Sequence, residues 1–286
     1  MQIAFTKMHG AGNSYIYLDL FQYDYKEDIF SELAQKIANV HTGIGSDGLI
    51  IIQPSKTADC GMRIFNKDGS EATNCGNGLR CVAKYIFDRH IVRQEQLTIE
   101  TKSGIMLAQV VVQDDSVIEV IVDMGRPLLL RKDIPMLGNP NELVINEIFP
   151  LPPQQSLLVT ALFLGNPNTV VFVNAIEQAP LRTLGGIIAN DMRFPHRSNV
   201  EFVEVVHAKA LKCRVWERGT GITEACGTGA CAAVVGAILN GFCQKGEEIV
   251  VQLSGGDLVI RWADNDHIWM RGPAEFIADG IYEFLS

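Results

Sequence analysis

The chain lacks the features that mark several common classes of protein. Its 286 residues carry 24 Lys and Arg against 33 Asp and Glu, a net charge of -9 without a basic stripe. Nucleic acid is therefore an unsuitable partner, because its phosphates are bound by clustered positive charge. No apolar run approaches the roughly 20 residues of a membrane span, and the opening MQIAFTKMHGAGN does not resemble a signal peptide. We expect a cytoplasmic protein that binds neither nucleic acid nor membrane.

Metal-binding patterns are missing as well. There are seven cysteines, an odd number, and none of them forms a Cys-x-x-Cys pair; the six histidines form no His-Glu-x-x-His motif. In a chain of this size without a secretion signal, such cysteines are typical of reduced thiols. We expect no metal site.

What the sequence does contain is an internal repeat. Residues 62–78 (MRIFNKDGSEATNCGNG) align without a gap with residues 213–229 (CRVWERGTGITEACGTG), at a constant offset of 151. The identical pairs are Arg63/Arg214, Cys75/Cys226, Gly76/Gly227 and Gly78/Gly229. Upstream, a Gly-Asn turn followed by an apolar run occurs in both halves, at Gly12 and Gly165. Agreement in order over two separate segments indicates a duplication.

Hydrophobic periodicity predicts an α+β structure for each half. We expect one domain at residues 1–122 plus 275–286 and a second at 123–274, with a turn-rich, proline-containing stretch at 124–153. The expected helices are 29–39, a segment running from Cys75 to Phe87, and 227–239. The expected strands are 4–5, 15–18, 49–53, 61–66, 97–100, 105–113, 117–123, 158–164, 169–173, 200–206, 211–217, 249–253, 258–262 and 267–270.

Each repeated cysteine precedes a glycine-rich helix start, where the partial positive charge of the helix lowers a thiol pKa and favours the thiolate. The flexible N–H groups of Gly76-Asn77 and Gly227-Thr228 could bind a carboxylate. Two such sites around one α-carbon would let Cys75 remove a proton while Cys226 delivers another, inverting the stereocentre. The other five cysteines are expected to be small buried hydrophobic residues.

A set of motifs covers nearly the whole chain: FTKMHGAGN, TGIGSDG, RIFNKDGSE, CGNGLRC, GNPN, FPHRSNVEF, RVWERGTG, ACGTGACAA and GGDL. With these motifs the chain resembles the diaminopimelate epimerase family. The resemblance implies two pseudo-symmetric duplicated domains, each a β-sheet barrel around a central helix, with the active site in the interdomain cleft. It also implies a small-molecule amino-acid substrate, no cofactor such as pyridoxal phosphate and no metal, and a possible homodimer. The implied reaction converts LL-diaminopimelate to the meso form, for lysine and peptidoglycan precursors.

The resemblance also assigns roles to individual residues. Cys75 and Cys226 would be the catalytic acid/base pair, and Glu217 would lie beside the reacting amino group. The remaining residues would bind substrate: Asn13, Gly76, Asn77, Gly227 and Thr228 around the reacting centre, and Asn66, Asn166, Asn199 and Arg218 at the distal end. From the residues alone, Asn13 and Asn66 could equally be turn residues, and Arg218 a solvated surface charge.

The chain departs from the family pattern at three positions. Asn168 replaces a histidine often found after Gly-Asn-Pro, and Gly48 and Ile222 replace a glutamine and a glutamate. The first departure motivates an alternative, a cofactor-independent racemase of another amino acid such as histidine. Retention of the polar distal residues argues against it, since a carboxylate and an amine need several polar partners.

Two other classes of function are less consistent with the sequence. Residues 43–48 spell Gly-x-Gly-x-x-Gly, but they follow a helix and precede a strand, the reverse of the order in a dinucleotide-binding loop. A binding protein without enzymatic activity would be suggested by loss of either repeated cysteine, and both are retained.

Overall fold

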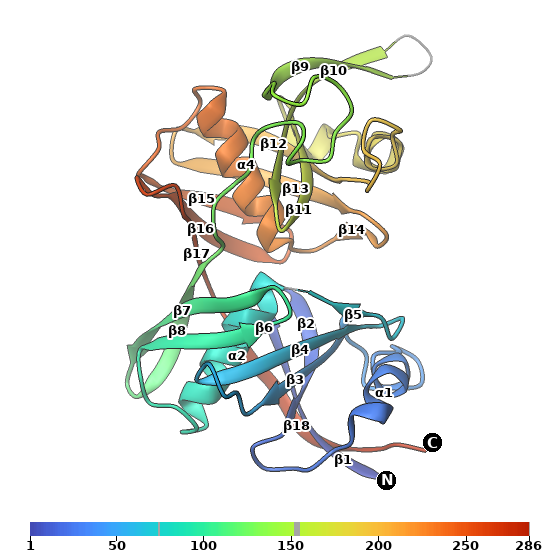
Figure 1. Cartoon of the computed structure of the whole chain (residues 1–286), viewed down its shortest axis with the longest axis vertical. Helices are drawn as coiled ribbons and strands as arrows, with labels where there is room; N and C mark the ends of the chain where they lie inside the picture. The colour runs from blue at the N-terminus through green and yellow to red at the C-terminus, as the bar shows by residue number, and fades with distance from the viewer. Residues whose placement is uncertain (74, 152–154, 286) are drawn as a thin grey trace. The chain divides into compact units, whose positions relative to one another are not determined.

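A computed structural model describes residues 1–73, 75–151 and 155–285. The chain forms two compact units, one of Met1–Val122 together with Gly272–Ser286 and one of Asp123–Arg271. Both termini belong to the first unit, as the blue and red ends of the ribbon show (Figure 1). Within the described ranges, no helix combines the length and the apolar character needed to cross a membrane.

The first unit is built mainly of strands, with one peripheral helix and one central helix. Its strands are β1 (Gln2–Gly10), β2 (Asn13–Asp19), β3 (Gly48–Gln53), β4 (Cys60–Asn66), β5 (Glu71–Ala72), β6 (Gln96–Thr101), β7 (Gly104–Gln113), β8 (Ser116–Asp123) and β18 (Glu275–Glu283). Its helical segments are η1 (Glu27–Ile29), α1 (Phe30–Ile37) and α2 (Gly76–Asp88).

The second unit has a matching set of elements. Its strands are β9 (Val144–Leu151), β10 (Gln155–Leu164), β11 (Asn166–Phe172), β12 (Asn199–His207), β13 (Ala210–Glu217), β14 (Gly221–Thr223), β15 (Glu248–Leu253), β16 (Gly256–Trp262) and β17 (Ile268–Gly272). Its helical segments are η2 (Ile176–Gln178), η3 (Leu181–Gly185), α3 (Gly186–Ala189) and α4 (Gly227–Leu239).

Strand pairing repeats from one unit to the other. In the first unit β2 runs antiparallel to β1 and parallel to β3, β4 runs antiparallel to β3 and parallel to β6, and β7 continues antiparallel. In the second unit β10 to β16 follow the same alternation, with β11 parallel to β12 and β13 parallel to β15. Each unit has one further antiparallel pair at this end of the series: β18 pairs with β1, and β9 pairs with β10. This shared topology confirms the duplication.

Each unit encloses one central helix (Figure 1). Every residue of α2 from Gly76 to Phe87 is buried, and α4 packs against β10, β11, β12, β13, β15 and β16. The glycines of the Gly-Asn turns have positive φ angles, +84° at Gly12 and +72° at Gly165, which suit a residue without Cβ. The prediction of an α+β fold with a central helix after each repeated cysteine is confirmed.

Four strands fall where none was predicted: the short strands β5 and β14, and the longer strands β9 and β18. β9 occupies part of the predicted turn-rich stretch 124–153 and carries Pro150, which an edge strand tolerates; among the described strands of its unit, β9 pairs with β10. The other longer strand, β18, contains Gly280, where a Cβ would stand 2.8 Å from the Phe5 ring. That close approach explains a glycine inside a strand. The prolines at 152 and 153, which also suggested turns, lie outside the described residues.

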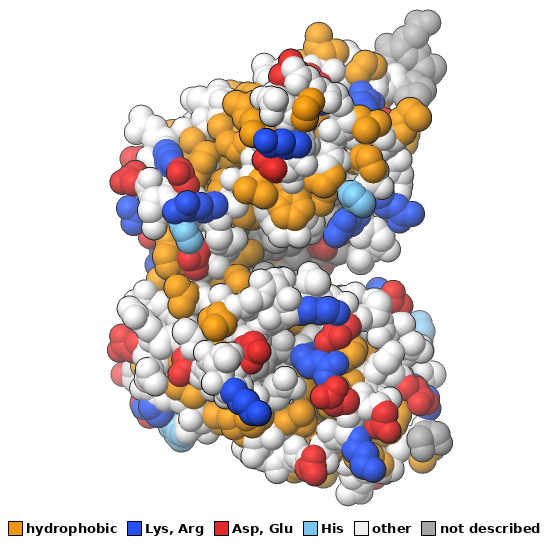
Figure 2. Space-filling model, in the orientation of Figure 1, with side chains coloured by type: hydrophobic (Ala, Val, Ile, Leu, Met, Phe, Trp, Pro, Cys, Tyr) orange, Lys and Arg blue, Asp and Glu red, His pale blue; other side chains and the backbone are white. Residues whose placement is uncertain are grey.

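Charged side chains of both signs are interspersed over the face shown in Figure 2, with no broad basic area on that face. This distribution agrees with the net charge of -9. It offers no extended surface on this side for a polyanion.

Candidate active site

Cys75 is the N-cap residue of α2. Its backbone is extended (φ -151°, ψ 107°), and its Sγ accepts the N–H of Gly78 at 3.3 Å. A Cβ at Gly78 would stand 3.6 Å from this sulfur and 2.6 Å from Cδ1 of Ile50, so the glycine lets the first turn pack closely on β3. The half-buried thiol is thereby held at the positive end of a buried helix.

Asn13 connects this thiol to its surroundings. Its Nδ2 donates to Asp47 Oδ2 at 2.8 Å, which leaves Oδ1 to accept from Asn77 Nδ2 at 3.1 Å and from Cys75 Sγ at 3.6 Å. Asp47 also accepts the N–H of Ser14 at 2.9 Å, which fixes the carboxylate. The structure therefore brings together three predicted site residues of the first unit, oriented by a carboxylate that the sequence analysis had not selected.

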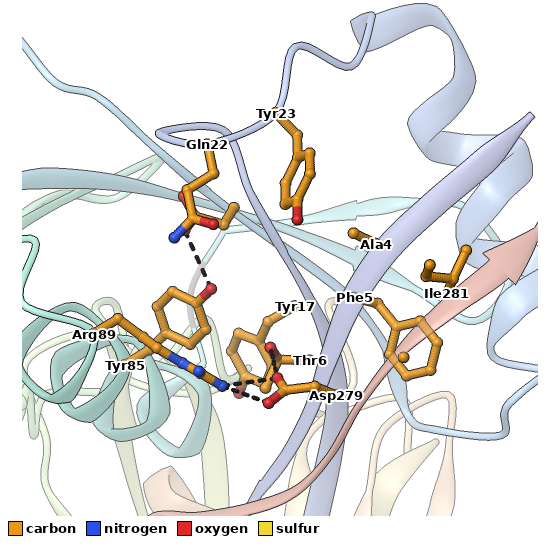
Figure 3. A pocket seen from close by; sticks show the side chains of 12 residues that line it. Ala4, Phe5, Thr6, Tyr17, Gln22, Tyr23, Tyr85, Arg89, Asp279 and Ile281 are labelled. Carbon is orange, nitrogen blue, oxygen red and sulfur yellow. Dashed lines mark hydrogen bonds and ion pairs between the residues drawn. The ribbon is translucent and has the colours of Figure 1, made fainter.

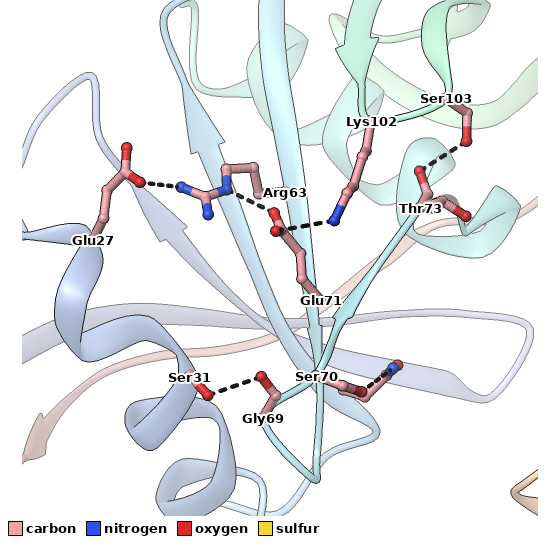
Figure 4. Close-up of polar contacts among 10 residues, drawn as sticks. Glu27, Ser31, Arg63, Gly69, Ser70, Glu71, Thr73, Lys102 and Ser103 are labelled. Atoms are coloured by element: carbon pink, nitrogen blue, oxygen red, sulfur yellow. Dashed lines mark hydrogen bonds and ion pairs between the residues drawn. The ribbon is translucent and has the colours of Figure 1, made fainter.

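Asn66, the last residue of β4, donates instead to Ser70 Oγ at 3.0 Å, in the turn between β4 and β5. Ion pairs brace these strands: Glu71 accepts from Arg63 at 2.8 Å and pairs with Lys102 at 3.4 Å (Figure 4). Ser103 donates to the carbonyl of Thr73 at 3.1 Å, which anchors the segment that leads to Cys75.

Cys226 has the same position in the second unit as Cys75 has in the first. It is the N-cap of α4, extended at φ -124° and ψ 112°, and its Sγ accepts the N–H of Gly229 at 3.4 Å. Thr228 Oγ1 lies 3.3 Å from the sulfur, and Asn199 Nδ2 lies 3.9 Å from it. Cys226 is more enclosed than Cys75, with only 6 % of its surface exposed.

Two of the residues predicted for the distal end, Asn199 and Arg218, come from β12 and the turn after β13. Asn199 is buried, and its Oδ1 accepts the backbone N–H of Arg218 at 3.0 Å. The Arg218 guanidinium is exposed and donates to the His196 carbonyl at 3.0 Å. Glu217 accepts from Thr223 Oγ1 at 2.6 Å. Asn199 therefore contacts both the Cys226 sulfur and the backbone of Arg218, the residue that follows Glu217.

Asn168 stands where the family often has histidine, and it is fully buried. Its Nδ2 donates to the backbone carbonyl of Asn166 at 2.7 Å and to Asn166 Oδ1 at 3.1 Å. It pairs with Asn199 in the parallel register of β11 and β12. In this chain the position therefore orients the predicted substrate-binding residue Asn166.

The prediction that the helix start lowers the thiol pKa is wrong for Cys226. Burial raises its pKa well above the usual range, and the negative charge of Glu217 adds to that rise. The Thr228 hydroxyl and the Gly229 N–H act in the opposite direction but do not prevail. Cys226 is therefore a thiol at neutral pH, suited to donate a proton.

Most of the remaining cysteines are poor candidates for chemistry. Burial raises the pKa of Cys60 to about 12 and that of Cys81 and Cys243 to about 11. Cys213 is fully buried, and its pKa is also raised well above the usual range. These thiols remain protonated and inaccessible, in agreement with a packing role.

Sequence reasoning overlooked Glu201, the third residue of β12. The carboxyl is fully buried, and burial followed by the charge of Glu217 raises its pKa well above the usual range. A glutamate within the apolar run of β12 was the available signal, because the repeat places Ile50 at the equivalent position.

A pocket elsewhere in the first unit contains none of the predicted site residues. It lies beside β1, β18 and the end of α2, where Asp279 pairs with Arg89 at 2.7 Å and accepts from Thr6 at 2.6 Å (Figure 3). Among the residues that the structure describes, no group of three or more His, Cys, Asp or Glu side chains is suited to a metal ion.

Comparison with known proteins covers almost the full chain. The family model for diaminopimelate epimerase matches residues 5–130 and 160–277. Diaminopimelate epimerase from Oceanobacillus iheyensis is 55% identical over 284 residues, 99% of each chain. The one from Bacillus velezensis is 53% identical over 278 residues, 97% of this chain and 98% of its own.

Solved structures of lower identity share the fold. A phenazine biosynthesis protein of the PhzF family from Bacillus anthracis aligns with a TM-score of 0.73 at 17% identity, covering 99% of this chain and 100% of its own. A probable proline racemase from Agrobacterium radiobacter aligns at 0.72 and 13% identity, covering 99% and 93%. The match to the family model and the identities of 53 and 55% over almost the full chain show that the chain belongs to the diaminopimelate epimerase family.

Proposed function

We propose that this chain epimerises one stereocentre of LL-diaminopimelate to give the meso form, in lysine and peptidoglycan precursor synthesis, without pyridoxal phosphate or a metal. The observation that carries the proposal is the pair of N-cap cysteines. Cys75 and Cys226 occupy the same repeat position, and each sulfur accepts the N–H three residues later. The identity of 50 to 55% to diaminopimelate epimerases supports the choice of substrate.

In the proposed reaction the two thiols act on opposite faces of one α-carbon. The N–H groups of Gly76-Asn77 and Gly227-Thr228 hold the reacting carboxylate and stabilise the negative charge that grows on it as the α-proton leaves. The thiolate of Cys75 takes that proton, and the thiol of Cys226 supplies another from the opposite face. The new carbon–hydrogen bond has inverted configuration, and the proton ends on Cys75.

The difference in burial between the two cysteines supports this division of roles. The raised pKa of Cys226 favours its protonated form. Because Glu217 contributes to the rise, the substrate's α-ammonium group beside Glu217 would partly neutralise that charge and help Cys226 release its proton.

The distal end of diaminopimelate carries a second carboxylate and a second amine. We propose that the exposed guanidinium of Arg218 binds the carboxylate, and that the amides of Asn66, Asn166 and Asn199 bind the rest. Asn13, fixed by Asp47, would face the reacting centre.

The family likeness also supports a homodimer, and the seven free thiols suit a reducing cytoplasm. On β18, Phe276 (37 % exposed), Ile277 (49 %) and Ile281 (65 %) present apolar side chains that a second copy could cover. Light scattering is expected to give twice the chain mass of 31.5 kDa; a single chain mass at assay concentration would contradict the dimer.

The activity is tested by incubating the reduced protein with LL-diaminopimelate and, separately, with L-histidine, and following stereochemistry by chiral chromatography. Formation of meso-diaminopimelate with no inversion of histidine is the expected result. Inversion of histidine alone would favour the racemase alternative that Asn168 motivates. Inversion of neither would overturn the proposed function.

A further inference from the structure

The backbone around the two cysteines repeats, but the side chain behind them does not. At the offset of 151, Glu201 on β12 corresponds to Ile50 on β3. Both side chains point at the same glycine of the following helix: a Cβ at Gly78 would meet Ile50 Cδ1 at 2.6 Å, and a Cβ at Gly229 would meet Glu201 Oε1 at 3.1 Å. One helix start therefore rests on a methyl group and the other on a carboxyl group.

The Glu201 carboxyl lies beside the residue whose N–H donates to the Cys226 sulfur. Gly229, against which Glu201 Oε1 packs, is the residue whose N–H donates to Cys226 Sγ at 3.4 Å. Glu201 is fully buried, and neither of its carboxyl oxygens has a well-aligned hydrogen-bond partner among the residues that the structure describes. The backbone N–H groups of Thr169 and of Glu201 itself act to lower its pKa, but burial outweighs them. A buried, unpaired carboxylate is costly, whereas the neutral acid is much less so.

The groups around Glu201 reinforce its neutral form. On β13, Glu217 contributes a negative charge and Cys213 a buried thiol; at the start of α4 stands Cys226. On the other side, β11 presents Val170 opposite Glu201 in the strand register. Because these neighbours supply no positive charge, Glu201 and Cys226 form a coupled pair in which two negative charges are strongly disfavoured.

We propose that Glu201 is a positioning residue that keeps the proton on Cys226, so that the two cysteines rest in different protonation states within a symmetric backbone. A negative charge on Glu201 opposes formation of the Cys226 thiolate, so that ionisation of one group disfavours ionisation of the other. At the equivalent position behind Cys75, Ile50 cannot carry such a charge. This inference rests on the proposed function, since it specifies how its two thiols divide the roles of acid and base.

In the test, the folded, reduced protein is treated briefly with iodoacetamide at a series of pH values. Mass spectrometry of its peptides then gives, for each cysteine, the pH at which alkylation reaches half its maximal rate. In Glu201→Gln, the pH midpoint for alkylation of Cys226 is expected to fall by about one unit. At a pH below both midpoints, Cys226 of the variant is therefore alkylated about tenfold faster than Cys226 of the wild type. The midpoint for Cys75 should stay unchanged. The matched control is Glu204→Gln on the same strand, whose carboxylate pairs with Lys212 at 3.2 Å and should move neither midpoint.

Glu201→Ile provides a second variant, because isoleucine already fills the equivalent space in the first unit and likewise removes the carboxyl. It should lower the Cys226 midpoint too, and in both variants the alkaline limb of the kcat/KM profile should shift in the same direction. Folded variants with the wild-type midpoint for Cys226 would overturn the inference. Alkylation needs no substrate, so a shifted midpoint in a protein that fails to turn over diaminopimelate would contradict only the proposed function.

Discussion

Alanine in place of either Cys75 or Cys226 is expected to lower kcat for epimerisation by about 10²- to 10⁴-fold, the usual contribution of one acid/base group. Each variant leaves one face of the α-carbon without a group that can take or give a proton. The double variant should be little slower than either single one, because the two thiols act as a unit. The rate of meso-diaminopimelate formation measures all three.

The matched control is Cys231→Ala, which removes a fully buried thiol from the interior of the same helix as Cys226. It should keep its activity while losing some stability, since only packing changes. If Cys75→Ala or Cys226→Ala turned over as fast as Cys231→Ala, a cysteine acid/base pair would be ruled out.

Replacement of Arg218 with alanine is expected to lower kcat/KM for diaminopimelate by about 10- to 150-fold, mainly through KM. The reason is loss of charge-assisted hydrogen bonds to the distal carboxylate, which contribute about 1.5 to 3 kcal/mol. The kcat/KM of Arg218→Lys should lie between those of the wild type and Arg218→Ala, because lysine keeps the positive charge but cannot form the bidentate contact. Steady-state kinetics with each variant measure the effect.

Arg261→Ala is the control for this experiment, because Arg261 is another exposed arginine of the second unit and donates to the Gly246 carbonyl at 2.8 Å. It should leave kcat/KM unchanged. A loss in Arg218→Ala that fell on kcat with KM unaltered would place Arg218 away from the distal end of the substrate.

The central helices were predictable because their signals are local. The predicted helix at 227–239 coincides with α4, and both cysteines are N-caps because a glycine-rich turn follows an extended residue. The strands β9 and β18 were missed because Pro150 and Gly280 usually interrupt strands. Their places, a strand edge in one case and contact with Phe5 in the other, depend on packing between distant segments.

The electrostatics of the site could be predicted only in part. The helix start argued for an acidic thiol at Cys226, but burial and Glu217 outweigh it. Burial of one thiol by residues from β12 and β13 is a tertiary effect that the motif around the cysteine does not encode. The contact between Asp47 and Asn13 likewise joins segments 34 residues apart.

The most direct test of the two-thiol account is early exchange with solvent in D2O. The reduced protein is incubated with LL-diaminopimelate, and both product and recovered substrate are analysed after a small fraction of conversion. The account predicts deuterium at the inverted carbon of the product and almost none in the substrate, because a solvent-equilibrated thiol delivers the new proton while the other holds the old one. Equal deuterium in both, or product without deuterium, would contradict it.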